Sequence, residues 1–143
     1  MGFAGLDRSG YPGDAIMKII RETTNLKWCG YYLAQAPAHK DPSWMGKRKV
    51  LTELGYGIAP LYLGEQTEGP GSRHPSAEKG TTDGKDAVRK MADEGFPPGS
   101  CVYLDLENGP PLPDSLRDYM NAWCSAVRDN GFLPGVYCTH ARR

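Results

Sequence analysis

Residues 101–108 read "CVYLDLEN", with two carboxylates one residue apart inside an apolar run. Successive side chains of a strand point to opposite faces, so this segment divides into two sets. The sets are Tyr103, Asp105 and Glu107 on one face and Val102, Leu104 and Leu106 on the other. The apolar set suits the layer beneath covering helices. The polar set must then face a barrel interior or a cleft.

Outward from this segment, short apolar or aromatic runs alternate with amphipathic ones. The pattern predicts strands at 2–7, 28–34, 57–64, 100–107 and 133–139. Between them it predicts helices at 13–23, 43–55, 85–96 and 115–131. A polar stretch at 65–84, rich in glycine, is expected to be a long connection, either a wall of a substrate cleft or a disordered insertion.

Alternation of strands and helices predicts an α/β fold, with a parallel sheet covered by helices. One architecture that fits is a doubly wound open sheet. The other is a (β/α)₈ barrel of the TIM type, which typically needs about 250 residues. With about five β/α units in 143 residues, we expect a single domain, 1–143, that is a barrel truncated at its C-terminus. The open sheet edge would then be covered by the remaining barrel segment, a second copy or a partner.

Composition excludes several classes of function. The chain has 17 basic and 17 acidic residues, and its formal net charge is zero. Binding to nucleic acid or to an anionic membrane surface needs a basic excess, so neither is expected. No apolar run approaches the roughly 20 residues of a membrane span. The four cysteines form no C-x-x-C pair and are expected to be buried small hydrophobes, although a disulfide remains open.

The paired acids suggest a chemistry. Two residues of strand rise place Asp105 and Glu107 roughly 6 to 7 Å apart at Cα. Glycosidases use two carboxyl groups about 5 to 9 Å apart, one to protonate the leaving oxygen. Asp7 adds a third acid at the end of the first predicted strand, and catalytic groups of parallel α/β folds collect at strand carboxyl ends. The alternatives are that these acids cap helices, form turns or ion pairs, or hold Mg²⁺ or Ca²⁺.

Aromatic residues recur near the same strand ends. The predicted substrate-binding tyrosines are Tyr32, Tyr62, Tyr103 and Tyr137. Sugar rings stack on aromatic faces, and a phenol can hydrogen-bond a sugar hydroxyl or orient an acid, although tyrosine is also simply a good strand residue. Gln66 is a further candidate for binding substrate, because it lies in the 65–84 stretch together with Glu65, Arg73 and His74.

Five segments in this order resemble the glycoside-hydrolase-like domain family of bacterial and phage proteins, which is distantly similar to the family-25 lysozymes. They are "GLDRSGYPG" (5–13), "CGYYLA" (29–34), "IAPLYLGEQ" (58–66), "GSCVYLDLEN" (99–108) and "LPGVYCTH" (133–140). The most specific parts are the G-x-D of the first strand, the P-x-Y-x-G of the third and the D-x-E of the fourth. The resemblance implies a (β/α)₈-type barrel with its site at the carboxyl face.

The resemblance also implies roles. Glu107 would be the general acid, and Asp105 and Asp7 would assist by charge or by positioning substrate. A protonated Glu107 needs a raised pKa, which burial and the negative charge of Asp105 would supply. We therefore expect a hydrolase of cell-wall glycan, without a cofactor, that works outside the cell or in its envelope. The alternatives are a non-catalytic glycan-binding barrel and a metal-dependent phosphodiesterase.

Overall fold

The computed structural model describes residues 2–67 and 74–139, and within them five strands alternate with four helices. The strands are β1 (Gly5–Leu6), β2 (Trp28–Tyr32), β3 (Gly57–Leu63), β4 (Cys101–Leu106) and β5 (Leu133–Cys138). The helices are α1 (Asp14–Thr23), α2 (Arg48–Glu53), α3 (Ala77–Asp93) and α4 (Asp114–Asp129). The predicted α/β class is confirmed, and each predicted strand is present.

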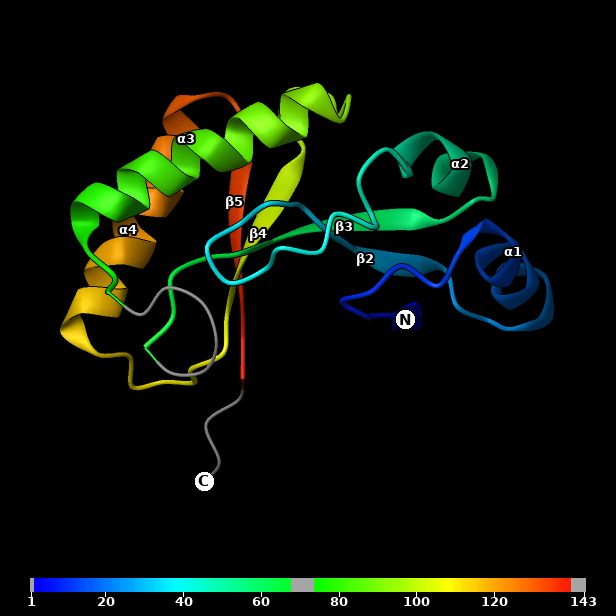
Figure 1. The fold of residues 1–143 in the computed structure, drawn as a ribbon, viewed down its shortest axis with the longest axis horizontal. Coiled ribbons are helices and arrows are strands. Elements are labelled where there is room, and N and C mark those ends of the chain that lie inside the picture. Colours follow the sequence, from blue (N-terminus) through cyan, green and yellow to red (C-terminus); the bar gives the residue numbers. More distant parts are fainter. Residues whose placement is uncertain (1, 68–73, 140–143) are drawn as a thin grey trace.

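All neighbouring strands pair in parallel, and their order in the sheet is β1-β2-β3-β4-β5. This order has no reversal, which a doubly wound sheet requires, so the arrangement is that of part of a barrel-like α/β domain. Crossovers between parallel strands are nearly always right-handed, and here each one leads to the next strand in the same direction, so the helices collect on one face. Figure 1 shows α3 and α4 over the β4–β5 part of the sheet, with α1 and α2 at its other end.

The core lies between the sheet and these helices. From β4 it takes the predicted apolar set, Val102, Leu104 and Leu106, all of which are buried. From α4 it takes a stripe at helical spacing, Leu116, Tyr119, Trp123, Ala126 and Val127. The four cysteines, which all lie in the described ranges, carry free thiols, and Cys138 is exposed rather than buried. In the part of the chain that the structure covers, no helix is long and apolar enough for a membrane span.

Helix α3 corrects one prediction. It begins at Ala77, so residues 77–84 of the expected 65–84 connection are helical, and the predicted helix at 85–96 starts too late. Ser76 caps the helix by accepting a hydrogen bond from the Lys79 amide. Gly80 and Gly84, which suggest a loop in sequence, lie on the buried side of α3. They let α3 approach α4 closely, because a Cβ at Gly80 would stand 2.3 Å from the carbonyl oxygen of Tyr119.

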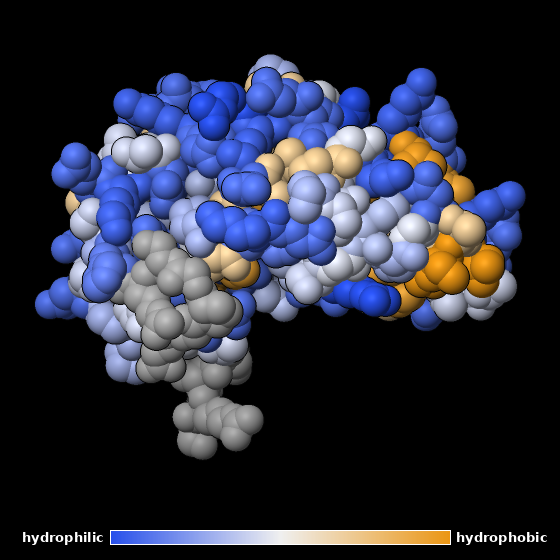
Figure 2. Space-filling view, viewed as in Figure 1, coloured by the Kyte–Doolittle hydropathy of each residue, from blue (hydrophilic) through white to orange (hydrophobic). Residues whose placement is uncertain are grey.

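On the face of the molecule that Figure 2 draws, the surface over α3 is mostly polar, whereas the end that holds α1 is more hydrophobic. Figure 2 shows hydrophobic side chains gathered at the end of the molecule where Figure 1 places α1. The exposed apolar residues of this helix are Ile16 and Ile19. They lie three residues apart and therefore share one helix face.

The close packing of α3 on α4 gives a prediction. Gly80→Ala places a methyl group against the backbone of α4, which cannot turn away, so the helices must separate. We expect a loss of about 1 to 3 kcal/mol in the free energy of unfolding, despite the better helix propensity of alanine. Denaturant unfolding measures it, and Lys85→Ala, at an exposed position of the same helix, is the control. If Gly80→Ala were as stable as the parent, α3 and α4 could not be packed as closely at Gly80 as the structure shows.

Candidate functional site

The three predicted acids line one pocket at the carboxyl ends of the strands. Asp7, Asp105 and Glu107 lie around a cavity of about 240 Å³, together with Tyr32 and Tyr137. Three further residues complete the lining, namely Leu106, Cys138 and Thr139. The structure therefore brings together acids from two strands and tyrosines from two others, which are separated by as many as 130 positions in the chain.

Strand register explains this convergence. Tyr32 pairs with Leu61, which pairs with Tyr103, and Asp105 pairs with Tyr137. Paired residues of a sheet share a face, so these side chains all point away from the helices. Glu107 follows β4 at a bend and is exposed, whereas Asp105, still within the strand, is only 5% exposed.

Two phenols hold Asp7 at the edge of this pocket. The hydroxyl of Tyr32 donates to one carboxylate oxygen at 2.5 Å, and the hydroxyl of Tyr137 donates to the other at 3.2 Å. Burial and the Asp7 carboxylate raise the pKa of Tyr32, and the charge of Asp7 raises that of Tyr137. Both phenols therefore keep their protons at neutral pH, and both oxygens of Asp7 act as acceptors.

The pKa of Asp105 is strongly raised. Burial, the charge of Glu107 and the charge of Asp7, in that order, raise the pKa of Asp105 to about 7. The sequence led us to expect this effect at Glu107. Asp105 lies within β4 and is buried, whereas Glu107 lies just beyond the end of β4 and is exposed to solvent.

Gln66 lies close to the acids but not in the pocket. Its side chain is 1% exposed, and its amide bonds the main chain on either side of Leu106. We therefore no longer expect Gln66 to contact substrate. His74, from the same polar stretch, is exposed, and Arg73 lies outside the described residues.

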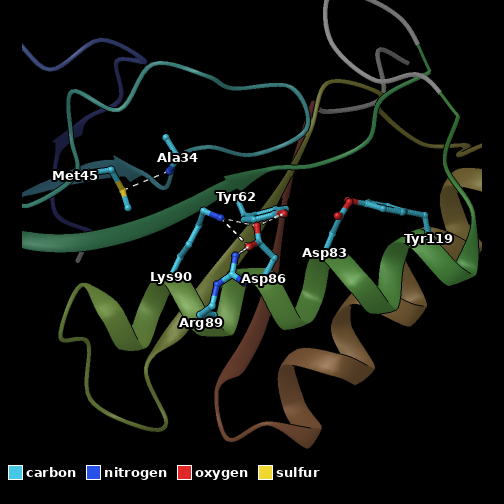
Figure 3. Close-up of polar contacts among 8 residues, drawn as sticks. All are labelled: Ala34, Met45, Tyr62, Asp83, Asp86, Arg89, Lys90 and Tyr119. Atoms are coloured by element: carbon cyan, nitrogen blue, oxygen red, sulfur yellow. Dashed lines mark hydrogen bonds and ion pairs between the residues drawn. The ribbon is translucent and has the colours of Figure 1, made fainter.

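Tyr62, a predicted substrate-binding residue, also lies outside the pocket. It pairs with Leu104 and so faces the helices, where it is 1% exposed. Its hydroxyl donates to Asp86 of α3 at 2.9 Å, and the same carboxylate is paired with Lys90 and Arg89 (Figure 3). Tyr62 therefore links the sheet to α3 through a hydrogen bond and does not face the substrate pocket.

A second, apolar cavity of about 460 Å³ adjoins the first on the open face of the sheet and shares Asp7 and Tyr137 with it. Trp28 and Tyr103 are the other aromatic residues in its lining. Each of these two rings packs on a glycine of the neighbouring strand. A Cβ at Gly5 would stand 2.1 Å from the Trp28 ring, and one at Gly135 would stand 2.5 Å from the Tyr103 ring.

Two neighbours of the site were missed in the sequence. Thr139 donates from its hydroxyl to the carbonyl of Glu107, and its position two residues after Tyr137 was the signal for it. His39 packs its buried ring against Tyr32 at 5.0 Å between centroids, and burial lowers its pKa. No local pattern pointed to His39, because the loop after β2 folds back to place it.

A metal site receives no support from the geometry. Within residues 2–67 and 74–139, no three His, Cys, Asp or Glu side chains are grouped closely enough to hold a metal ion. Asp7, Asp105 and Glu107 share a pocket without forming such a group.

Solved structures place this arrangement among known folds. The chain superimposes on an uncharacterized B. stearothermophilus protein with a TM-score of 0.72 and 19% identity, over 96% of this chain and 61% of that one. It superimposes on the modular autolysin LytC from Streptococcus pneumoniae, solved with a synthetic peptidoglycan ligand, with a TM-score of 0.65 and 14% identity, over 96% and 32% of the two chains. The chain thus spans less than two thirds of either protein, and the likeness establishes the fold alone.

Sequence comparison gives the family. No curated protein matches the chain. Residues 20–142 match the family described as "Rv2525c-like, glycoside hydrolase-like domain", which confirms the resemblance found in the sequence motifs. Because the match covers most of the chain, this protein belongs to the Rv2525c-like family of glycoside hydrolase-like domains.

Proposed function

We propose that this protein hydrolyses a glycan of the bacterial cell wall by carboxylate acid catalysis. The observation that carries the proposal is one pocket in which Asp7, Asp105 and Glu107 meet beside Tyr32 and Tyr137. A glycosidase needs one carboxyl group that holds a proton and another that is ionised nearby. The family name and the peptidoglycan ligand of the autolysin LytC support this choice of substrate. A place outside the cell or in its envelope follows from the same proposal.

Roles can be assigned from burial. In the proposal Asp105 and Glu107 form a coupled pair that holds one proton near neutral pH, with the proton resting on Asp105. Glu107 is exposed and is the carboxyl group that reaches the glycosidic oxygen. In this step the shared proton passes from Asp105 to Glu107, which donates it to the glycosidic oxygen as general acid and leaves both carboxyl groups ionised. Asp7 stabilises positive charge that develops on the sugar, and the phenols that bind Asp7 orient it.

The apolar cavity supplies binding in this proposal. Tyr103 and Tyr137 present aromatic surface beside Asp7, which suits the apolar face of a sugar ring. The same observation favours the second candidate function, a glycan-binding module without turnover. The two candidates differ in whether the acids perform chemistry.

We further propose that the sheet is part of a (β/α)₈ barrel. Sequential parallel order, helices on one face and an apolar cavity on the other are the features that support it. The exposed side chains of the edge strand β5, among them Leu133, Val136 and Tyr137, would be covered by the remaining barrel segment or by a second copy.

The catalytic role of Glu107 can be tested directly. Glu107→Gln removes the proton donor but keeps the size of the side chain, so release of reducing sugar from peptidoglycan should fall by about 100-fold or more. Glu78→Gln, an exposed change in the first turn of α3, should release sugar at the parental rate. Equal release by the parent and Glu107→Gln would overturn the proposal, and saturable binding without any release would favour the binding module.

The proton on Asp105 predicts how stability depends on pH. The folded pKa of about 7 lies above the ordinary value of 3.8, so the folded chain binds more protons than the unfolded chain between these values. The parent should therefore lose stability as pH rises from about 4 to 7. Asp105→Asn cannot lose a proton, so its stability relative to the parent should improve by about 2 to 4 kcal/mol between pH 4 and pH 8. Urea unfolding at both pH values checks this, and a constant difference would contradict a raised pKa.

The barrel proposal requires that the face of the sheet opposite the helices be covered, and this requirement can be tested. The chain of 143 residues by itself exposes that face, so we expect it to dimerise or to bind a hydrophobic dye. Sedimentation equilibrium and dye fluorescence measure the two effects. Leu133→Lys, which charges the exposed edge, should weaken both. A monomer that binds no dye would speak against the barrel proposal.

A further inference from the structure

Gln66 follows β3 and directs its buried amide to the main chain. Its Nε2 donates to the carbonyl oxygens of Gly64 at 3.1 Å and of Asp105 at 3.0 Å. Its Oε1 accepts from the amide of Glu107 at 2.9 Å. One side chain therefore binds the backbone of both acids of the D-x-E motif.

These bonds continue the sheet beyond its last backbone pair. The pairing of β3 with β4 ends at Leu63 and Asp105. In a parallel ladder, a residue bonds the carbonyl and the amide that flank its partner on the next strand. The Gln66 side chain does the same around Leu106, and it does so at the point where β4 passes into the bend that carries Glu107.

The segment that carries Gln66 is itself fixed to the helices. The Tyr119 hydroxyl accepts from the amide of Glu65 at 3.0 Å and donates to Asp83 at 2.6 Å, a pair drawn in Figure 3. Lys79 reaches the Glu65 carboxylate at 3.4 Å. A Cβ at Gly64 would stand 2.6 Å from the Tyr119 hydroxyl, so the chain passes close to α4 there. Gln66 thus starts from a rigid support.

We propose that Gln66 is a positioning residue that fixes Glu107 relative to Asp105 and makes no contact with the glycan. The inference rests on the proposed function for its catalytic consequence, but its structural part concerns the two acids alone. It replaces the substrate contact expected from sequence. A buried amide that bonds backbone on both sides of one residue leaves little freedom to either neighbour.

Gln66→Met tests the inference, because methionine has nearly the same length and lacks the amide. The matched control is Thr67→Val, which removes the adjacent hydrogen bond from Thr67 to Asn108 and leaves the Gln66 bonds in place. Gln66→Asn, whose amide is one methylene too short, is the second variant should methionine prevent folding. Loss of folding in both would overturn the inference and make Gln66 a residue of the scaffold.

The first readout is the pKa of Asp105, followed by NMR of carboxyl-labelled protein. Gln66→Met should release Glu107 and lower the pKa of Asp105 by about half a unit or more. In a Glu107→Gln background the same substitution should leave that pKa unchanged, because the charge that it displaces is already gone. An equal decrease in both backgrounds would show general loosening of the site and overturn the inference.

The second readout is turnover of peptidoglycan. Gln66→Met should lower kcat by about 10- to 100-fold and leave KM within about twofold, whereas a residue that contacts glycan would raise KM. Thr67→Val should match the parent in both constants. If the parent releases no sugar, the proposed function fails, and the NMR comparison still decides whether Gln66 positions Glu107.

Discussion

Parallel pairing in a fixed register brings Asp7, Asp105 and Tyr137 to the same side of the sheet. A slip of one residue in any strand would turn its side chains to the opposite face and scatter the acids among the helices. The register is maintained by the buried face, where Val102 and Leu104 would otherwise be expelled from the core. The energy that assembles the polar site is therefore mostly hydrophobic and comes from the other side of the sheet.

The three acids of the site differ in burial and in their contacts. Asp105 lies inside the strand and its pKa is raised by burial and by two nearby charges, whereas Glu107 lies in the solvent-exposed bend beyond it. Asp7 is bound on both oxygens by phenols. The three carboxylic acids thus have three different environments, and such differences adapt the same chemical group to different roles in acid–base chemistry. Gln66 joins the first two environments through the main chain.

Much of the fold and the grouping of the three acids at the strand ends could be predicted from the sequence, because strand runs and D-x-E spacing are local signals. The N-terminal half of α3 could not, since Gly80 and Gly84 weaken a helix locally and are used for packing that only the partner helix reveals. Tyr62 was predicted to bind substrate because it lies near a strand end, but that position does not show which face of the sheet its side chain takes relative to β4. Burial of Asp105 rather than Glu107 depended on where β4 stops, and strand ends are poorly marked in sequence.

The fluorescence of Trp28 can be distinguished from that of the other tryptophans by its solvent exposure. Two of the three tryptophans, Trp44 and Trp123, have no solvent exposure, whereas Trp28 is 36% exposed and borders the apolar cavity beside Asp7. Its emission is therefore the long-wavelength, quencher-accessible part of the intrinsic fluorescence. A molecule or a chain segment that covers the open face would shift this emission to the blue and shield it from iodide. The protein thus carries its own optical reporter of whether that face is occupied.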